Sequence, residues 1–199
     1  MSAQDTSFAR LVSLACHDLR TPLATVSGFA KTLIRMDGVD EQTERYLGMI
    51  EVASVQLSEL LEQLGLVARI EDGRWEPLIG EADSLALAHA AAEPHGGAVV
   101  VSGTGTQVAV DEEAAARALG GLAHCARRHG GLDEVELRVD GASIAVAPVA
   151  ADVAAICLGL DLKDLGAAVG TRALVALGAA VEAEDETVVV RLPLAPVVS

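Results

Sequence analysis

The residues best suited to chemistry form the hexapeptide HDLRTP at positions 17–22. The imidazole of His17 offers a nitrogen lone pair that can act as a nucleophile. The neighbouring carboxylate of Asp18 can orient that ring or accept its proton. Thr21 follows His17 by four residues, so it projects from the same face of a helix. His17, Asp18 and Thr21 are therefore the candidate catalytic residues, and the alternative is a surface histidine beside a helix bend.

The hexapeptide lies within a segment whose apolar periodicity predicts one long helix from Phe8 to Leu33. His17 falls outside the apolar stripe, which puts its ring on the solvent-facing side. Pro22 removes a backbone donor and clashes with the preceding turn, so we expect the helix to bend after the histidine. Apolar or small residues recur every three or four positions, at Phe8, Val12, Ala15, Leu19, Pro22 or Leu23, Val26, Ala30 and Leu33.

A second helix is predicted from Glu41 to about Glu71, after a turn that ends at the capping residue Asp40. Two antiparallel helices with one apolar stripe each cannot bury both stripes as a hairpin. A two-fold homodimer that forms a four-helix bundle solves this problem, and the alternative is a hairpin packed on the rest of its own chain. The heptad stripe consists of Tyr46, Ile50, Ala53, Leu57, Leu60, Leu64 and Val67.

The hexapeptide resembles the phosphoacceptor box of bacterial two-component sensor histidine kinases. That box has a histidine, an acid, two variable residues, then Thr, Ser or Asn, and a proline. The resemblance implies that His17 carries a phosphoryl group on a ring nitrogen. It also implies that residues 1–73 are the dimerisation and histidine phosphotransfer domain of such a protein.

Residues 74–199 alternate strand-like and helical runs, which indicates a layered α/β sandwich with one mixed sheet and helices on one face. Their order resembles the ATP-binding domain of histidine kinases, so the expected fold is α+β: a dimeric helical hairpin followed by a degenerate kinase-type sandwich. Turns are predicted at Gly103-Thr104-Gly105 and, as a hairpin, at Asp140-Gly141. The predicted strands are Trp75–Ile79, Ala98–Ser102, Gln107–Val110, Glu134–Val139, Ala142–Ala147, Ala180–Ala183 and Thr187–Leu192, and the predicted helices are Ala82–Ala92, Glu112–His129 and Leu165–Leu177.

The same resemblance implies which residues nucleotide binding would need. This chain departs from the family at three of them. Cys125 stands where the family has a magnesium-binding Asn, and a thiol is a poor ligand for a hard cation. Pro148 stands in place of the acid that recognises adenine, and Gly166 alone remains of the phosphate-binding glycines. The chain between Pro148 and Gly166 is also too short for the family's lid. We therefore expect no cofactor-binding residues and no bound cofactor, with magnesium supplied by a partner.

The expected partners are response regulator receiver domains that dock beyond His17 on the same helix face. The leading hypothesis is a histidine phosphotransferase without ATP-dependent kinase activity of its own: His17 accepts phosphoryl from a receiver aspartate and passes it to another receiver. Thr21 could instead hold a water that hydrolyses the receiver's phosphate. The alternatives are a divergent ATP-dependent sensor histidine kinase, a response-regulator phosphatase and a non-enzymatic dimeric scaffold. The candidate partner-binding residues are Ala24, Thr25, Gly28 and Thr32, with Lys31 and Arg35 offering charge.

Composition limits the other function classes. A formal net charge of −15 disfavours nucleic acid and anionic membranes as partners. Apolar runs are too short to span a bilayer and no signal-peptide pattern is visible, so we expect a cytoplasmic protein. Cys16, Cys125 and Cys157 form no Cys-x-x-Cys pair, and His124 and His129 are five residues apart, so the sequence predicts no metal ligands.

Overall fold

The structure, a computed structural model, describes residues 3–35 and 40–196, without the side chains of residues 3–11, 13–15 and 18. It divides into two compact units, Met1–Trp75 and Glu76–Ser199. Within the described ranges, no helix combines the length and the hydropathy that a membrane crossing needs.

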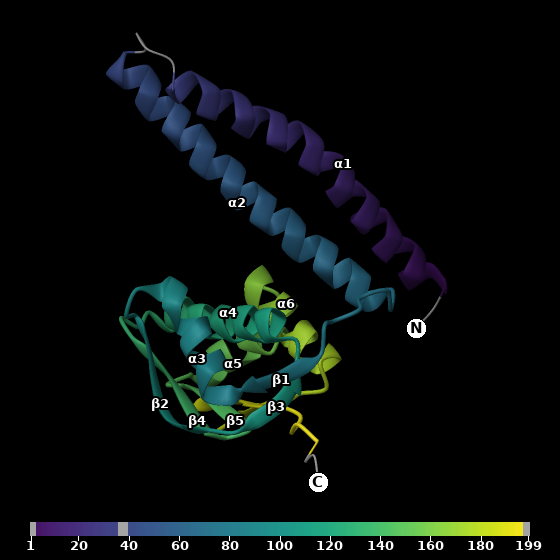
Figure 1. Cartoon of the computed structure of the whole chain (residues 1–199), viewed down its shortest axis with the longest axis vertical. Helices are drawn as coiled ribbons and strands as arrows, with labels where there is room; N and C mark the ends of the chain where they lie inside the picture. The colour runs from purple at the N-terminus through teal and green to yellow at the C-terminus, as the bar shows by residue number, and fades with distance from the viewer. Residues whose placement is uncertain (1–2, 36–39, 197–199) are drawn as a thin grey trace. The chain divides into compact units, whose positions relative to one another are not determined.

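The first unit is a hairpin of two long helices that run antiparallel, α1 (Ala3–Ile34) and α2 (Glu41–Glu71) (Figure 1). Both predicted helices are confirmed, and α1 continues through Pro22. Asp40 caps α2 as predicted, since its carboxylate accepts a hydrogen bond from the backbone nitrogen of Thr43 at 2.9 Å. This hydrogen bond lowers the pKa of Asp40. The predicted turn at residues 37–39 lies outside the described residues.

Small side chains line the contact between the two helices. Cys16 and Ala30 are only 4% and 3% exposed. A Cβ atom added at Gly65 would lie 3.9 Å from the Cβ atom of Cys16, so these two residues face each other across the hairpin. The buried residues of α2 are Leu47, Ser54, Gly65 and Ala68. Because these residues are mostly small, the helix backbones approach closely and many of the larger apolar side chains lie beside the contact.

The larger apolar side chains of the hairpin remain exposed in a single chain. The stripe predicted for α1 is divided, because Ala30 enters the contact whereas Leu19, Val26 and Leu33 are between 42% and 54% exposed. A contiguous apolar face of this kind marks an interaction surface. Five residues of the predicted heptad are exposed large apolar residues of α2: Tyr46, Ile50, Leu57, Leu60 and Leu64. Met49, Val52 and Val55 of α2 are also exposed but lie outside that heptad.

The second unit is an α/β sandwich with a five-stranded mixed sheet, which confirms the predicted fold class. Four helices cover one face of this sheet (Figure 1), and the core between the layers includes Leu87, Leu119, Leu137 and Leu174. The strand order is β2-β4-β5-β7-β6, with β2 parallel to β4 and the other pairs antiparallel. The strands are β2 (Val99–Gly105), β4 (Val135–Gly141), β5 (Ser143–Ala147), β6 (Ala180–Glu184) and β7 (Thr187–Arg191), and the helices are α3 (Ser84–Ala92), α4 (Glu112–Gly130), α5 (Ala151–Cys157) and α6 (Leu165–Ala176).

The structure differs from the sequence-based prediction at the start of this unit. The predicted strand Trp75–Ile79 is wrong, and the strands β1 (Gly80–Asp83) and β3 (Gln107–Val110) form a separate two-stranded sheet. The backbone nitrogen of Leu78 donates to the carboxylate of Asp111 at 2.8 Å, so it pairs with a side chain instead of a neighbouring strand. Helix α5 and the short 3-10 helix Glu93–His95 were not predicted.

The two predicted turns have different outcomes. The Asp140-Gly141 hairpin is confirmed, because Asp140 pairs with Ser143 and Gly141 has a φ of +57°. The turn at Gly103-Thr104-Gly105 is wrong, because β2 runs through it. Gly103 is needed there for close approach: its φ is +104°, and an added Cβ atom would lie 1.9 Å from the carbonyl oxygen of Val139.

We predict that Gly103→Ala destabilises the second unit by about 3 kcal/mol or more, since it adds both a backbone clash and a strained φ. Urea denaturation of the full chain, followed by circular dichroism, measures this change. Gly80→Ala is the matched control, because a Cβ atom there meets nothing within 4 Å. Equal midpoints for the two variants would contradict the close approach of β2 and β4.

Candidate phosphoacceptor site

The packing of Cys16 determines where His17 lies. Successive residues of an α-helix differ by about 100° around the axis. Because Cys16 is buried against α2, His17 is turned outward, and its side chain is exposed. Thr21 is exposed one turn later. Asp18 belongs to the same helix, but its side chain lies outside the described residues, so its role beside the ring stays a prediction.

Helix α1 presents three different faces. One face packs on α2 through Cys16 and Ala30. Counting about 100° per residue, Val26 and Leu33 lie roughly 180° from His17. The exposed apolar stripe and the histidine therefore occupy opposite flanks of the helix, so a partner helix can cover the stripe without covering His17.

The predicted partner-binding residues are all exposed and lie on the flank of His17. Two of them have hydroxyl groups that are satisfied within the helix. Thr25 donates to the carbonyl oxygen of Thr21 at 3.1 Å, and Thr32 donates to that of Gly28 at 2.8 Å. Lys31 lies 3.7 Å from the carboxylate of Glu51, a loose and largely exposed ion pair. The full set is Ala24, Thr25, Gly28, Lys31, Thr32 and Arg35.

A groove of about 490 Å³ runs between α1 and α2 on this flank. Ala24, Gly28 and Lys31 line it, whereas Thr25, Thr32 and Arg35 are not among its lining residues. The other lining residues are Ser27 on α1 and Val55, Ser58, Glu59 and Glu62 on α2. The α2 residues were missed from the sequence because they lie off the heptad stripe. Their spacing of three, one and three residues marks a second helix face and could have identified them.

Cys125, Pro148 and Gly166 are the positions that correspond to the nucleotide-binding groups of the kinases. Two of them lie in internal contacts and one lies at a strand end. Cys125 is fully buried, with its sulfur 3.4 Å from that of Cys157. Pro148 is exposed directly after β5. Gly166 lies against α4, since a Cβ atom added at Gly121 would meet its carbonyl oxygen at 3.3 Å. Glycines thus bring α4 and α6 together at this point.

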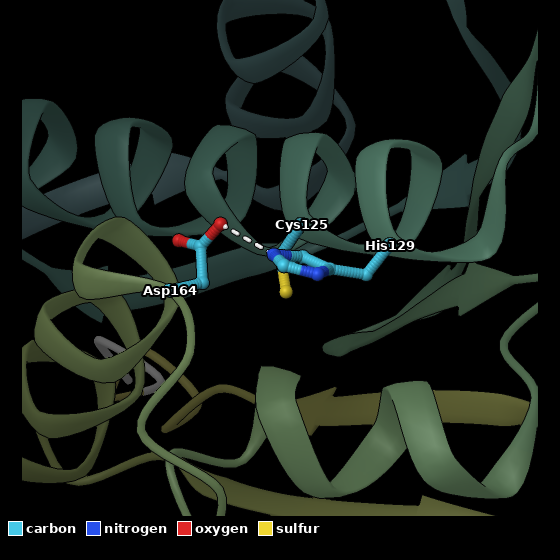
Figure 2. A group of neighbouring side chains, drawn as sticks. All are labelled: Cys125, His129 and Asp164. Carbon is cyan, nitrogen blue, oxygen red and sulfur yellow. Dashed lines mark hydrogen bonds and ion pairs between the residues drawn. The ribbon is translucent and has the colours of Figure 1, made fainter.

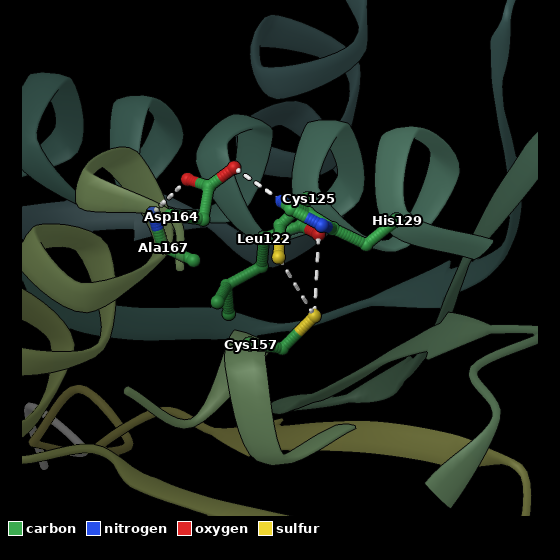
Figure 3. Close-up of polar contacts among 6 residues, drawn as sticks. All are labelled: Leu122, Cys125, His129, Cys157, Asp164 and Ala167. Carbon is green, nitrogen blue, oxygen red and sulfur yellow. Dashed lines mark hydrogen bonds and ion pairs between the residues drawn. The ribbon is translucent and has the colours of Figure 1, made fainter. Parts of the chain in front are cut away.

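The first turn of α6 already holds a carboxylate of the protein. The free backbone donors of a helix N-terminus attract anions. Here Oδ1 of Asp164 accepts a hydrogen bond from the backbone nitrogen of Ala167 at 3.0 Å (Figure 3). Asp164 therefore satisfies a donor that would otherwise be available to a phosphate group.

Asp164 also belongs to a cluster with Cys125 and His129, whose ligand atoms all lie within 4.8 Å of one another (Figure 2). Nε2 of His129 lies 3.1 Å from Oδ2 of Asp164. The hydrogen bond with Cys157, together with burial, raises the pKa of Cys125. His124, five residues before His129, does not belong to the cluster and stacks on His95 with ring centroids 5.8 Å apart. The four-residue spacing of Cys125 and His129 is the sequence signal that could have identified the cluster.

The comparisons with known proteins agree with the geometry of the first unit. Residues 9–73 match the family model of the His Kinase A (phospho-acceptor) domain. This range contains the hexapeptide, most of α1 and all of α2.

Three curated relatives each match about a third of the chain. The probable sensor histidine kinase TcrY of Mycobacterium tuberculosis is 31% identical over 72 residues, which is 36% of this chain and 15% of TcrY. The sensor histidine kinase TrcS of the same organism is 35% identical over 71 residues, or 35% of this chain and 14% of TrcS. The sensor protein DivL of Caulobacter vibrioides is 32% identical over 57 residues, or 29% of this chain and 7% of DivL. The match thus spans a small part of these relatives.

Two solved structures share the fold across most of the chain. Full-length ShkA, crystallised in complex with AMPPNP, has a TM-score of 0.68 and 21% identity, covering 96% of this chain and 47% of ShkA. The Acinetobacter baumannii histidine kinase AdeS has a TM-score of 0.55 and 19% identity, covering 90% of this chain and 98% of that structure. Residues 9–73 are thus similar to His Kinase A phospho-acceptor domains, and the chain shares its fold with the solved structures of ShkA and AdeS.

Proposed function

We propose that this chain is a histidine-containing phosphotransfer protein of a two-component phosphorelay. His17 accepts a phosphoryl group from a receiver aspartate and passes it to a second receiver. The observation that carries this proposal is the exposed His17 on the groove side of a phospho-acceptor hairpin, opposite the apolar stripe.

The transfer step needs mainly positioning. A ring nitrogen of His17 attacks the phosphorus of the aspartyl phosphate, and a P–N bond forms as the P–O bond to the aspartate breaks. The aspartate leaves as a carboxylate, and the reverse step phosphorylates the next receiver. Such transfers depend on alignment and charge neutralisation. We propose that the receiver supplies the magnesium ion and that Asp18 orients the imidazole.

The groove gives a receiver a place to dock near the histidine. Three of the four α1 residues that line it are Ala24, Ser27 and Gly28, whose small side chains leave room for a helix from the partner. Lys31 and Arg35 add positive charge on the same flank and could attract an acidic partner surface. We therefore propose that a receiver helix docks along this groove.

Contacts in the second unit support transfer without ATP-dependent autophosphorylation. Asp164 caps α6, where its negative charge also opposes the approach of phosphate groups. Cys125 is buried against Cys157 and offers no oxygen ligand for magnesium. We propose that this unit keeps the kinase fold without binding nucleotide.

A second candidate is a divergent ATP-dependent sensor histidine kinase. The observation that favours it is the likeness to ShkA over 96% of this chain, because that structure is a complex with AMPPNP. The two candidates differ in the phosphoryl donor, which is an aspartyl phosphate in the first and ATP in the second.

We predict that His17→Ala abolishes phosphotransfer, because it removes the attacking nitrogen. The purified chain is mixed with a panel of radiolabelled phosphorylated receiver domains, and acid-labile label on the chain is followed with time. His89→Ala is the control, since His89 is an exposed histidine of the second unit. Label that appears on the wild-type chain from ATP and magnesium alone, and is lost in His17→Ala, would instead establish the kinase.

We predict that Gly28→Arg slows transfer at least about tenfold, because the arginine side chain fills the groove. A tenfold loss corresponds to about 1.4 kcal/mol of the binding free energy of the receiver. The hairpin should remain folded, because a Cβ atom at Gly28 meets nothing within 4 Å. Initial transfer rates at low receiver concentration measure the effect. Gln56→Arg adds the same charge at an exposed position of α2 outside the groove lining and should leave the rate unchanged. Equal rates for the two variants would exclude docking in the groove.

We further propose that the exposed apolar stripe of the hairpin binds a second copy of this chain and forms a four-helix bundle. His Kinase A domains are dimeric, and burial of an aliphatic side chain stabilises an interface by about 1.5–3 kcal/mol. In a two-fold dimer each stripe residue contributes twice.

We predict that Leu57→Glu weakens the homodimer at least about 100-fold, since Leu57 is a 51% exposed stripe residue. Sedimentation velocity over a concentration series measures the dissociation constant. Gln56→Glu introduces the same charge at the neighbouring exposed position and should leave the dimer intact. A wild-type chain that stays monomeric at high concentration would refute the proposal.

A further inference from the structure

We propose that Cys125, His129 and Asp164, with Cys157 as the fourth ligand, form a binding site for a divalent transition metal ion of the Zn²⁺ type. This site lies in the second unit, so it is independent of phosphotransfer at His17. The side chains converge from three helical segments: α4 carries Cys125 and His129, α5 ends at Cys157, and Asp164 precedes α6.

Three of the four donor atoms converge in space. One atom from each of Cys125, His129 and Asp164 lies within 4.8 Å of the others (Figure 2). Cys125 and His129 are four residues apart, which puts both on one face of α4. Figure 3 shows the sulfur of Cys157 beside that of Cys125, on the side of the cluster opposite Asp164.

Two pairs of ligand atoms already lie at nearly the distances found around a tetrahedral ion. Zinc binds nitrogen or oxygen at about 2.0–2.1 Å and sulfur at about 2.3 Å, so two nitrogen or oxygen ligands would lie about 3.3 Å apart and two sulfurs about 3.8 Å apart. The nitrogen–oxygen distance between His129 and Asp164 is 3.1 Å, and the sulfur–sulfur distance between Cys125 and Cys157 is 3.4 Å. Both pairs need to separate by only a few tenths of an ångström, whereas the sulfur of Cys157 is not among the ligand atoms that lie within 4.8 Å of one another and must move toward His129 and Asp164 when the ion binds.

The donor chemistry selects the class of ion. Two thiols, an imidazole and a carboxylate suit zinc or cobalt, whereas magnesium and calcium prefer oxygen ligands. Each thiol would release its proton on binding, and the two thiolates and the carboxylate would balance the charge of the ion. The surroundings exclude water, because both cysteines are fully buried and the side chain of Asp164 is 8% exposed.

His129 provides the route by which an ion reaches the cluster. Its side chain is 21% exposed, more than that of the other ligands, so its ring can turn toward solvent and back. Asp164 would serve two partners at once, because Oδ1 caps α6 at Ala167 while Oδ2 faces His129. A bound ion would therefore link α4 to the start of α6 and to the end of α5.

The experiment uses the full chain, freed of metal with a chelator and kept reduced. Titration with Co²⁺ should produce the thiolate charge-transfer absorption of a tetrahedral site at a stoichiometry of one ion per chain. Zn²⁺ should displace the cobalt and raise the melting temperature of the metal-free protein by roughly 5–10 °C at a hundredfold excess over the dissociation constant.

Two variants separate ligation from folding. Cys125→Ala should abolish the charge-transfer band and weaken zinc binding at least about 100-fold. Asp164→Asn keeps a good capping residue but removes the charge, so zinc affinity should fall at least about tenfold while the metal-free melting temperature is retained. Asp111→Asn is the matched control, because Asp111 caps α4 in the same way at a distant site. Cys16→Ala is the control for thiols and should leave the band unchanged.

The proposal is overturned if the reduced wild-type chain gives no charge-transfer band. It is also overturned if Cys125→Ala and Asp164→Asn bind zinc as tightly as the two controls do. Loss of two titratable thiols in the metal-free wild-type chain, absent from Cys125→Ala, would show a disulfide between Cys125 and Cys157 in place of the metal site.

Discussion

The close contact between α1 and α2 is the constraint on which the candidate site depends. Cys16 faces Gly65 across the hairpin, and this contact fixes the rotation of α1 about its own axis. A helix rotated by one residue would turn His17 by about 100° into the hairpin and turn the apolar stripe by the same angle away from its present flank. The small residues of the contact thus hold His17 on one flank of α1 and the exposed apolar residues on the other.

A similar close approach organises the second unit. An added Cβ atom at Gly170 would lie 3.0 Å from the carbonyl oxygen of Ala118, so α4 and α6 touch through their backbones. This contact brings the start of α6, and with it Asp164, next to Cys125 and His129. Asp164 therefore caps the N-terminus of α6 and also belongs to the one group of metal-type ligands found among the described side chains.

Much of the fold could be predicted because its signals are local. The limits of α2, β3 and α4 follow from capping residues and short-range periodicity, and the Asp140-Gly141 hairpin follows from turn chemistry. The strand expected at Trp75–Ile79 failed because a run of apolar residues does not reveal where its backbone donors find partners. The backbone nitrogen of Leu78 donates to the carboxylate of Asp111, which is 33 residues away, and the residues around Leu78 do not predict that hydrogen bond.

By itself, the sequence determined the resemblance of residues 17–22 to a phosphoacceptor box and the phase of His17 relative to the apolar positions of its helix, since both depend only on residues within a few helical turns. The tertiary structure alone decided which apolar residues α2 buries and which remain exposed. It also decided that Val55, Ser58 and Glu62 complete the groove, and that Asp164 meets His129 across 35 residues. Contacts between elements depend on how distant side chains pack, and periodicity within one element does not specify that packing.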